Sequence, residues 1–508
     1  MSAFLDALAR VPPLLAAHVL LSAAALLLAL VIATPLAIWS ARRPAVARVA
    51  LGIASLIQTI PSLALLALFF PLLLSLRAIV AVPALGFLPA LLALTLYALL
   101  PLLRNGVAGL HGIDPAVIEA ADAVGMTPSQ KLRLVEAPLA APVAIAGLRT
   151  AATWTIGAAT LSTTVGAASL GDLIFAGLQT QSWSLVLAGC VAAAGLALAV
   201  DGLIGLIERG LATRRRGLAI GALAVLLLGL AAATAPLWRA GGERRVVVGA
   251  KNFGEQFILA RLIGDRLTRA GYTVEYREGL GSAVIFGAVA SGEVDVYVDY
   301  AGTIWTNEMR RTDTPPRAPM LRDLAAWTAG KGVRMAGPLG FENAYAFAMK
   351  RGDAARLGVR SLADLAARSP SLRLGSDLEF LERPEWAAVR RAYPMRFAST
   401  TPYSPTFMYQ ALASGRVDVI SAFSSDGRIA ADGLVTLTDP KRAIPGYDAI
   451  LLVAPAHARD ARFLAAIRPL VGRIPVDAMR AANLQVDRAD DKRTPEQAAR
   501  WLAERIGL

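Results

Sequence analysis

A nine-residue element followed by an aromatic residue occurs twice in the second half of the chain. Residues 288–296 and 411–419 share the pattern Ala-x-Ala-Ser-Gly-x-Val-Asp-Val, which predicts a helix, a glycine turn and a strand in each place. Tyr300 and Phe423 each lie four residues after the last Val, at the carboxyl end of the strand, where open α/β sheets bind ligands. We therefore expect two similar lobes that face each other across a cleft and contribute one ring each. The alternative is two unrelated elements that share a glycine helix stop.

A second motif lies between residues 114 and 138. Asp114 can cap a helix, and Gly125 suits the left-handed turn that would follow it. A capping-box spacing starts at Thr127, and Pro138 is expected to end the second helix. This pattern predicts a compact helical hairpin, although an ordinary surface connection between two membrane spans has the same local chemistry.

Several other kinds of chemistry find little support. The chain has 1 Cys and 3 His, at scattered positions, so a disulfide framework is excluded and no metal site is expected. No nucleophile, base and orienting group stand together, so we expect no catalytic residues and no bound cofactor. The phosphate-loop pattern Gly-x-x-x-x-Gly-Lys-Ser/Thr does not occur, so any ATP is expected to be used by another polypeptide.

The elements that position these motifs differ between the two halves of the chain. Hydrophobic residues make up 56% of the 508 residues, and crossing a bilayer takes about 20 of them in a helix. Residues 244–508 contain no such run, whereas strand and helix patterns alternate there, as is typical of an α/β fold. We expect six membrane spans, at residues 15–39, 52–75, 82–103, 141–165, 184–207 and 217–237.

Charge predicts the orientation of the spans. Residues 1–240 hold 14 Lys and Arg against 8 Asp and Glu, and the remainder holds 37 against 30, with no dense basic block in either half. A nucleic-acid partner is therefore not expected, despite the net charge of +13. Basic residues gather in alternate connections, which predicts an outside N-terminus and an extracytoplasmic second half. The sixth span resembles a signal peptide, but after five other spans we expect an uncleaved tether.

The hairpin motif resembles the EAA signature of ABC importer permeases, with Ala137 where Leu is usual. Residues 57–66, 96–105 and 146–151 look like segments of the permeases that import glycine betaine, choline and carnitine. The resemblance implies that the hairpin docks on a separate ABC ATPase subunit and that two copies of the chain form the pore. The residues that match the signature are Glu119, Ala120, Ala121, Gly125 and Pro138.

Five segments of the second half look like the binding proteins of osmoprotectant ABC importers: residues 251–256, 295–303, 340–345, 380–383 and 423–428. In that family four aromatic rings surround a trimethylammonium group, while Lys, Arg and Thr side chains hold a carboxylate. Such a cation has no N–H to donate, and ring faces attract it by roughly 0.5 to 2 kcal/mol each. When the family's ligand residues are transferred to this sequence, the resemblance implies an aromatic box of Tyr300, Tyr345, Phe423 and Tyr447. The implied polar contacts are Lys251, Thr303, Arg383 and Asn343. Phe423 departs from the usual Tyr, which leaves the ligand preference there open.

Together these features predict a multi-domain protein, in which an all-α six-helix ABC importer transmembrane domain precedes an α/β two-lobed domain of the type II periplasmic-binding-protein class. The predicted domains are residues 1–213, a sixth span and tether at 214–243, and a binding domain at 244–508. Lobe one would comprise residues 244–347 and 452–508, lobe two residues 348–451, with residues 345–349 and 450–453 as hinge strands.

The predicted function is the permease and substrate-binding component of an ATP-driven importer in the cytoplasmic membrane. Its ligand would be glycine betaine, choline, carnitine or a related quaternary-ammonium compound. The alternatives are a larger betaine such as ergothioneine, or a betaine sensor that does not transport.

Overall fold

The chain folds into two compact units. The computed structural model describes residues 2–76, 79, 82–180, 182–239, 245–378, 380–488 and 491–508. One unit comprises residues 1–175 and 184–242, and the other comprises residues 176–183 and 243–508. The predicted start of the binding domain, at residue 244, lies outside the described residues, as does most of the predicted tether after residue 239.

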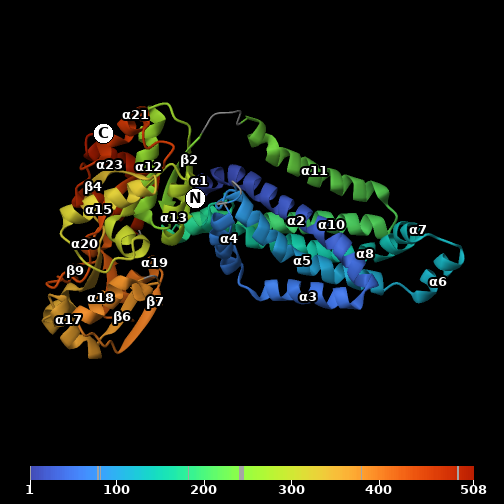
Figure 1. Ribbon diagram of the computed structural model, residues 1–508, viewed down its shortest axis with the longest axis horizontal. Helices are drawn as coiled ribbons and strands as arrows, with labels where there is room; N and C mark the ends of the chain where they lie inside the picture. Colours follow the sequence, from blue (N-terminus) through green and yellow to red (C-terminus); the bar gives the residue numbers. More distant parts are fainter. Residues whose placement is uncertain are drawn as a thin grey trace. The chain divides into compact units, whose positions relative to one another are not determined.

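Helices make up the described part of residues 2–239 (Figure 1). Five helical stretches there are long and apolar enough to cross a bilayer, and a bent pair gives a sixth if its two halves count as one span. The predicted set of six apolar segments is therefore found, with one of them broken. The helices are α1 (Ser2–Ala9), α2 (Val11–Arg42), α3 (Pro44–Thr59), α4 (Ser62–Leu76), α5 (Phe87–His111), α6 (Pro115–Ala123), α7 (Pro128–Lys131), α8 (Ala137–Ala159), α9 (Gly171–Gln179), α10 (Trp183–Ala212) and α11 (Arg216–Arg239).

The broken segment is the second predicted span. Residues 52–75 were expected to form one helix, but α3 and α4 meet at an angle of 100°. Pro61 is the cause, because the ring of a proline disfavours helical backbone in the residue before it. Ile60 accordingly adopts an extended conformation, with φ −72° and ψ 127°, and its carbonyl accepts a hydrogen bond from the Tyr97 hydroxyl instead of a helical N–H.

The hairpin of α6 and α7 forms as predicted and lies at one end of the helical bundle (Figure 1). The Asp114 side chain accepts a hydrogen bond from the Ala116 amide at 2.9 Å, and Gly125 adopts a φ of +78°. Thr127 closes a capping box at the start of α7. An ion pair of 2.6 Å between Lys131 Nζ and Asp122 ties the second helix to the first.

The second helix of the hairpin does not end at Pro138. A π-helical turn at Leu132–Glu136 follows α7, and α8 then continues through Pro138 into the membrane-spanning helix. In this turn the Ala137 amide donates to the Leu132 carbonyl, five residues back. The wider turn makes room for a proline ring, which in a regular helix clashes with the carbonyl four residues earlier. The predicted helix stop is therefore wrong.

The second unit contains two five-stranded sheets with the same topology, which confirms the predicted two-lobed α/β fold. In each sheet the first three strands are parallel and the fourth and fifth each run antiparallel to their neighbour. The first sheet has the order β2 (Val274–Leu280), β1 (Val246–Lys251), β3 (Val296–Tyr300), β10 (Asp448–Val453) and β4 (Arg334–Glu342). The second has the order β7 (Ser399–Tyr403), β6 (Arg373–Asp377), β8 (Val419–Phe423), β5 (Tyr345–Lys350) and β9 (Leu434–Thr436).

Helices connect these strands. They are α12 (Gly254–Arg269), α13 (Ser282–Ser291), α14 (Ala301–Thr303), α15 (Arg317–Gly330), α16 (Arg351–Leu357), α17 (Leu362–Arg368), α18 (Pro384–Ala392), α19 (Pro405–Ala413), α20 (Arg428–Ala431), α21 (Ala461–Ile467), α22 (Val476–Asp487) and α23 (Pro495–Arg505). On α12 the apolar residues at positions 257–259, 262, 263 and 267 form a buried face.

The repeated sequence element forms equivalent structures in the two sheets. It covers the end of α13 and the start of β3 in one copy, and the end of α19 and the start of β8 in the other. Gly292 and Gly415 end the two helices with φ angles of +76° and +70°, a conformation that glycine adopts without strain. Tyr300 and Phe423 are the last residues of β3 and β8, each the third strand of its sheet. The interpretation as a duplicated element is confirmed.

The predicted hinge strands are wrong. Strand β5 belongs wholly to the second sheet, where Tyr345 pairs with Phe423, and β10 belongs wholly to the first. The chain crosses between the sheets at residues 343–344 and 437–447 instead. A strand satisfies its backbone hydrogen bonds within one sheet, so a crossing falls in the irregular segments before and after it. The lobe boundaries therefore lie before residue 345 and before residue 448, and not at residues 347 and 451 as predicted.

Candidate ligand-binding site

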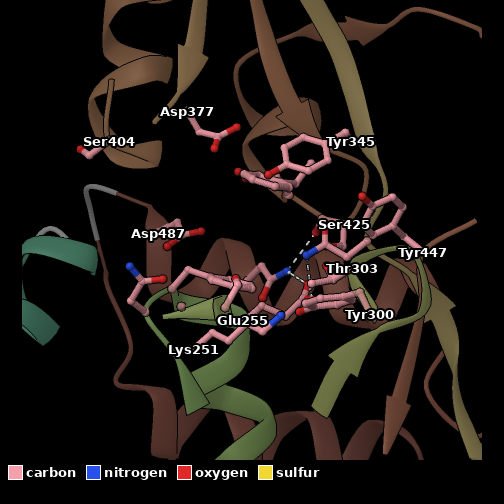
Figure 2. A pocket seen from close by; sticks show the side chains of 18 of the residues that line it. Lys251, Glu255, Tyr300, Thr303, Tyr345, Asp377, Ser404, Ser425, Tyr447 and Asp487 are labelled. Atoms are coloured by element: carbon pink, nitrogen blue, oxygen red, sulfur yellow. Dashed lines mark hydrogen bonds between the residues drawn. The ribbon is translucent and has the colours of Figure 1, made fainter. Parts of the chain in front are cut away.

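A cavity of about 250 Å³ lies between the two sheets and brings all the predicted ligand residues together (Figure 2). The lining residues come from both sheets and from the segments that join them. The predicted residues that line it are Lys251, Tyr300, Thr303, Asn343, Tyr345, Arg383, Phe423 and Tyr447. Their roles toward a ligand stay predictions, but their convergence from positions 196 residues apart in the chain is a structural fact.

Five aromatic rings follow one another along the cavity. Tyr345 lies 5.0 Å from Phe423 and 5.9 Å from Tyr447, centroid to centroid. Phe253 stacks on Tyr300 at 6.1 Å and on Phe423 at 6.5 Å, and so links the first sheet's ring to that of the second. We call these five residues the ring series. Sequence reasoning missed Phe253, although it lies within the segment 251–256 that carried the resemblance.

Buried hydrogen bonds hold two of the rings in place. The Tyr300 hydroxyl donates to Glu255 Oε1 at 2.6 Å and accepts from the Gln256 side chain at 2.9 Å. The Tyr447 hydroxyl donates to Glu385 and accepts from Arg383 Nη2. Burial raises the pKa of both phenols well above the usual range, so both stay neutral donors. The ring faces are therefore fixed before any ligand enters.

The two cations expected to hold a ligand carboxylate already have carboxylate partners. Lys251 forms a buried ion pair with Asp299, and Arg383 pairs with Glu385 at 3.0 Å. A ligand carboxylate would compete with these two side chains for the same positive charge. The cations also lie over rings, with Lys251 Nζ 5.4 Å from the centroid of Tyr300.

The other two predicted ligand contacts are Thr303 on α14 and Asn343 in the segment that joins the two sheets. Thr303 is buried in α14, directly after Tyr300 and β3. The Asn343 amide nitrogen of the backbone donates to the Tyr447 carbonyl at 3.0 Å, and its side chain donates to Glu255. Trp305, two residues after Thr303, is a core residue whose indole donates to the Asp313 carbonyl.

A polar end of the cavity lies away from Tyr300 and Tyr447 (Figure 2). Asp377, Ser404 and Asp487 line this end. Burial raises the pKa of Asp487 to about 6. Within the described residues, no three or more His, Cys, Asp or Glu side chains form a group suited to a metal ion.

Two protein families match the chain. Residues 244–504, more than half of the chain, match the family described as the substrate binding domain of the ABC-type glycine betaine transport system. Residues 33–213 match the family described as the binding-protein-dependent transport system inner membrane component. The chain belongs to both families. The resemblances drawn from its sequence are confirmed, and this importer chain is the fused permease and substrate-binding component of a betaine-type ABC importer.

The importer chain is therefore a multi-pass protein of the inner membrane with an extracytoplasmic binding domain, and it works with an ATPase partner and a small ligand. It is 28% identical over 482 residues to the ergothioneine transport permease/ergothioneine binding protein EgtU of Helicobacter pylori (strain G27), which covers 90% of this chain and 83% of the relative. It is 40% identical over 194 residues to the choline transport system permease protein OpuBB of Bacillus subtilis (strain 168), covering 38% of this chain and 85% of the relative.

A crystal structure of a glycine betaine/carnitine/choline ABC transporter is also similar to the binding half of the importer chain. It is 24% identical, with a TM-score of 0.46, over 52% of this chain and 98% of that structure.

The importer chain also has a charged cluster within its helical unit that sequence reasoning missed. Arg149 on α8 contacts Asp201 at 2.8 Å and Glu208 at 3.1 Å, both on α10. Gly205 lies between the two acids, and a side chain there would begin 3.4 Å from the guanidinium carbon. Charged side chains within membrane helices are costly unless paired, so this cluster fixes α8 against α10.

The signature residues of the importer chain lie on the hairpin. Glu119, Ala120 and Gly125 are exposed, whereas Ala121 is buried. Pro138 lies beyond the π-helical turn, at the start of α8. The buried Glu136 of that turn pairs with Arg42, which anchors the base of the hairpin to the end of α2.

Proposed function

We propose that the importer chain binds the trimethylammonium group of its ligand among Tyr300, Tyr345, Phe423 and Tyr447, with Phe253 as a fifth ring. One observation carries this proposal: rings from both sheets converge on a single cavity. A quaternary nitrogen has no N–H, so hydrogen bonds cannot hold it, whereas each ring face contributes roughly 0.5 to 2 kcal/mol. Lys251, Thr303, Arg383 and Asn343 would contact the other end of the ligand.

The ligand is a quaternary-ammonium compound such as glycine betaine, choline or carnitine. A larger betaine is the second candidate, because the relative that covers 90% of this chain is named for ergothioneine. The polar side chains of Asp377 and Asp487, which line the same cavity as the rings, support this candidate because they could contact polar groups of a longer molecule.

The hairpin is proposed to dock on a separate ATPase subunit. Val117, Val124 and Leu134 expose apolar side chains in this region, as a docking surface requires. Two copies of the chain would form the pore, with two ATPase subunits on the cytoplasmic side. ATP binding would bring the ATPases together, move the hairpins and open the pore toward the binding domain, and hydrolysis would reset it.

Calorimetry on the full chain in lipid nanodiscs tests the binding step. Glycine betaine, choline, carnitine and ergothioneine are titrated into the wild type and into Tyr300→Ala. At least one ligand should bind, and its affinity should fall in the variant by about 3- to 30-fold, which corresponds to 0.5 to 2 kcal/mol. The proposal is overturned if none of the four binds, or if the variant keeps the wild-type affinity.

Uptake into vesicles that contain the chain and its ATPase tests the transport step. The ligand that binds in nanodiscs should accumulate only when ATP is supplied on the ATPase side. Binding without ATP-dependent accumulation would identify the chain as a sensor.

A further inference from the structure

Glu255 is a buried carboxylate beside the ring series, and none of the cations in the described part of the chain pairs with it. It is 4% exposed and lines the cavity, and among the described residues it takes part in no ion pair. Neutral donors alone surround its oxygens. Oε1 accepts from the Tyr300 hydroxyl at 2.6 Å and from Asn343 Nδ2 at 3.1 Å, and Oε2 accepts from Asn483 Nδ2 at 2.8 Å.

The described cations that line the cavity are in the opposite situation, because each has a carboxylate of its own. These pairs are Lys251 with Asp299, Arg383 with Glu385, and Arg428 with Asp426. Each pair presents a dipole rather than a net charge to a ligand. Among the described residues, the carboxyl group of Glu255 is therefore left without a cationic partner next to the rings.

The other acidic residues that line the cavity do not take the place of Glu255 beside the rings. Asp377 and Asp487 line the polar end of the cavity, away from Tyr300 and Tyr447 (Figure 2). Glu255, in contrast, is hydrogen-bonded directly to the hydroxyl of Tyr300, one of the proposed box rings. Donation to a carboxylate also moves electron density into that ring, which strengthens its attraction for a cation.

We infer that Glu255 supplies the counter-charge for the quaternary ammonium and so selects a permanent cation over an uncharged molecule of the same shape. This inference rests on the proposed function. The carboxylate acts through the field in the cavity and through the Tyr300 ring, without a hydrogen bond to the ligand. At an effective dielectric constant near 20, a unit charge several ångströms away changes affinity by about 10- to 100-fold.

Burial of the carboxylate is consistent with such a role. It raises the pKa of Glu255, because desolvation penalises the charged form more than its hydrogen bonds favour it. A cation bound in the cavity would favour the ionised form in turn. Ionisation of Glu255 is therefore coupled to binding of the cation, because the ligand supplies the positive charge that the buried carboxylate lacks.

The test compares variants that separate charge from position. Glu255→Gln removes the charge and nearly keeps the shape, Glu255→Asp keeps the charge, and Tyr300→Phe keeps the charge but removes the hydrogen bond from the ring. Affinities of the full chain in nanodiscs are measured for choline, glycine betaine and ergothioneine. Glu255→Gln should lose at least about 10-fold, Tyr300→Phe should lose clearly less than Glu255→Gln, and Glu255→Asp should recover part of the loss.

Uncharged head groups give a second measurement. 3,3-Dimethyl-1-butanol has the shape of choline and 3,3-dimethylbutanoate that of glycine betaine, each with carbon in place of nitrogen. Both carbon compounds should bind the wild type weakly, and their affinity for the Glu255→Gln variant should be no lower. If Glu255→Gln and Tyr300→Phe lose affinity equally, or if the carbon compounds and the cations lose it equally, Glu255 only positions the ring and the inference is overturned. If the wild type binds none of the three quaternary-ammonium compounds, the proposed function fails as well.

Discussion

The rings of Tyr345 and Tyr447 meet edge to face, with their centroids 5.9 Å apart and their planes at 90°. Tyr345 begins β5 in the second sheet, and Tyr447 directly precedes β10 of the first. Two perpendicular faces from different lobes can thus contact one cation at the same time. Closing the lobes on a ligand would bring both faces to it together.

Tyr345→Leu should weaken ligand binding by about 3- to 30-fold, because it removes one ring face while keeping an apolar side chain. Tyr345→Phe keeps the face and should stay within about 3-fold of the wild type. Calorimetry on the full chain measures both. Tyr403→Leu on β7, outside the cavity lining, is the matched control and should bind normally. Unchanged affinity in Tyr345→Leu would remove this residue from the box.

Gly125 should be required for transport but not for binding. Its φ of +78° strains any residue with a side chain, by roughly 1 to 2 kcal/mol, although no atom lies within 4 Å of an added Cβ. Gly125→Asn tolerates this conformation and should keep most ATP-dependent uptake, whereas Gly125→Val should lose most of it. Ligand affinity should be the same in both variants. Equal uptake by the two variants would show that the turn geometry does not matter for coupling.

Arg149 should be needed for a stable helical unit. Arg149→Leu leaves Asp201 and Glu208 close together without their cation, which is costly in a membrane. The yield of monodisperse protein in detergent should fall several-fold. Adding Asp201→Asn and Glu208→Gln removes the unpaired charges and should restore much of it. If the triple variant is no better than Arg149→Leu, the arginine acts by packing rather than by charge.

Asp487 should make the stability of the binding domain depend on pH. Burial raises its folded pKa to about 6, above the value of about 3.9 in an unfolded chain. The folded state therefore binds the proton more tightly, and the stability this contributes is present below pH 4 and lost as the pH rises through 6. Asp487→Asn does not titrate, so at pH 7.5 it should exceed the wild type by up to about 2 kcal/mol.

Thermal melting followed by tryptophan fluorescence at pH 4 and at pH 7.5 measures this difference. The gap between Asp487→Asn and the wild type should be small at pH 4 and larger at pH 7.5. Asp353→Asn, a change at a half-buried position on α16 outside the cavity lining, is the control and should show no such gap. A constant gap at the two pH values would contradict the prediction.

Features that depend on neighbouring residues could be predicted from the sequence. The Asp114 cap, the Gly125 turn and the capping box at Thr127 each involve residues at most three positions apart, so local chemistry determines them. The apolar segments and the duplicated element are patterns of the same kind. The four residues of the predicted aromatic box were named through the resemblance to a family, and the structure brings their rings to one cavity, while their role toward a ligand stays a prediction.

The effect of a proline on a helix could not be predicted from the local sequence alone. Pro61 breaks a predicted span by 100°, whereas Pro138 is accommodated in a helix that continues. Both residues disfavour a regular helix, and the outcome depends on what the surrounding backbone can do. At Ile60 a tyrosine hydroxyl from another helix satisfies the freed carbonyl, and before Pro138 a π-helical turn widens the helix.

Which charged residues pair with one another could be learned only from the tertiary structure. Lys251 and Arg383 were expected to hold a ligand, but folding places Asp299 and Glu385 beside them. Glu255, which had no predicted role, accepts a hydrogen bond from Asn483, 228 positions away, and pairs with no cation among the residues that the structure describes. A charged residue's type says that it needs a partner when buried, but only packing between distant segments determines which partner lies within reach.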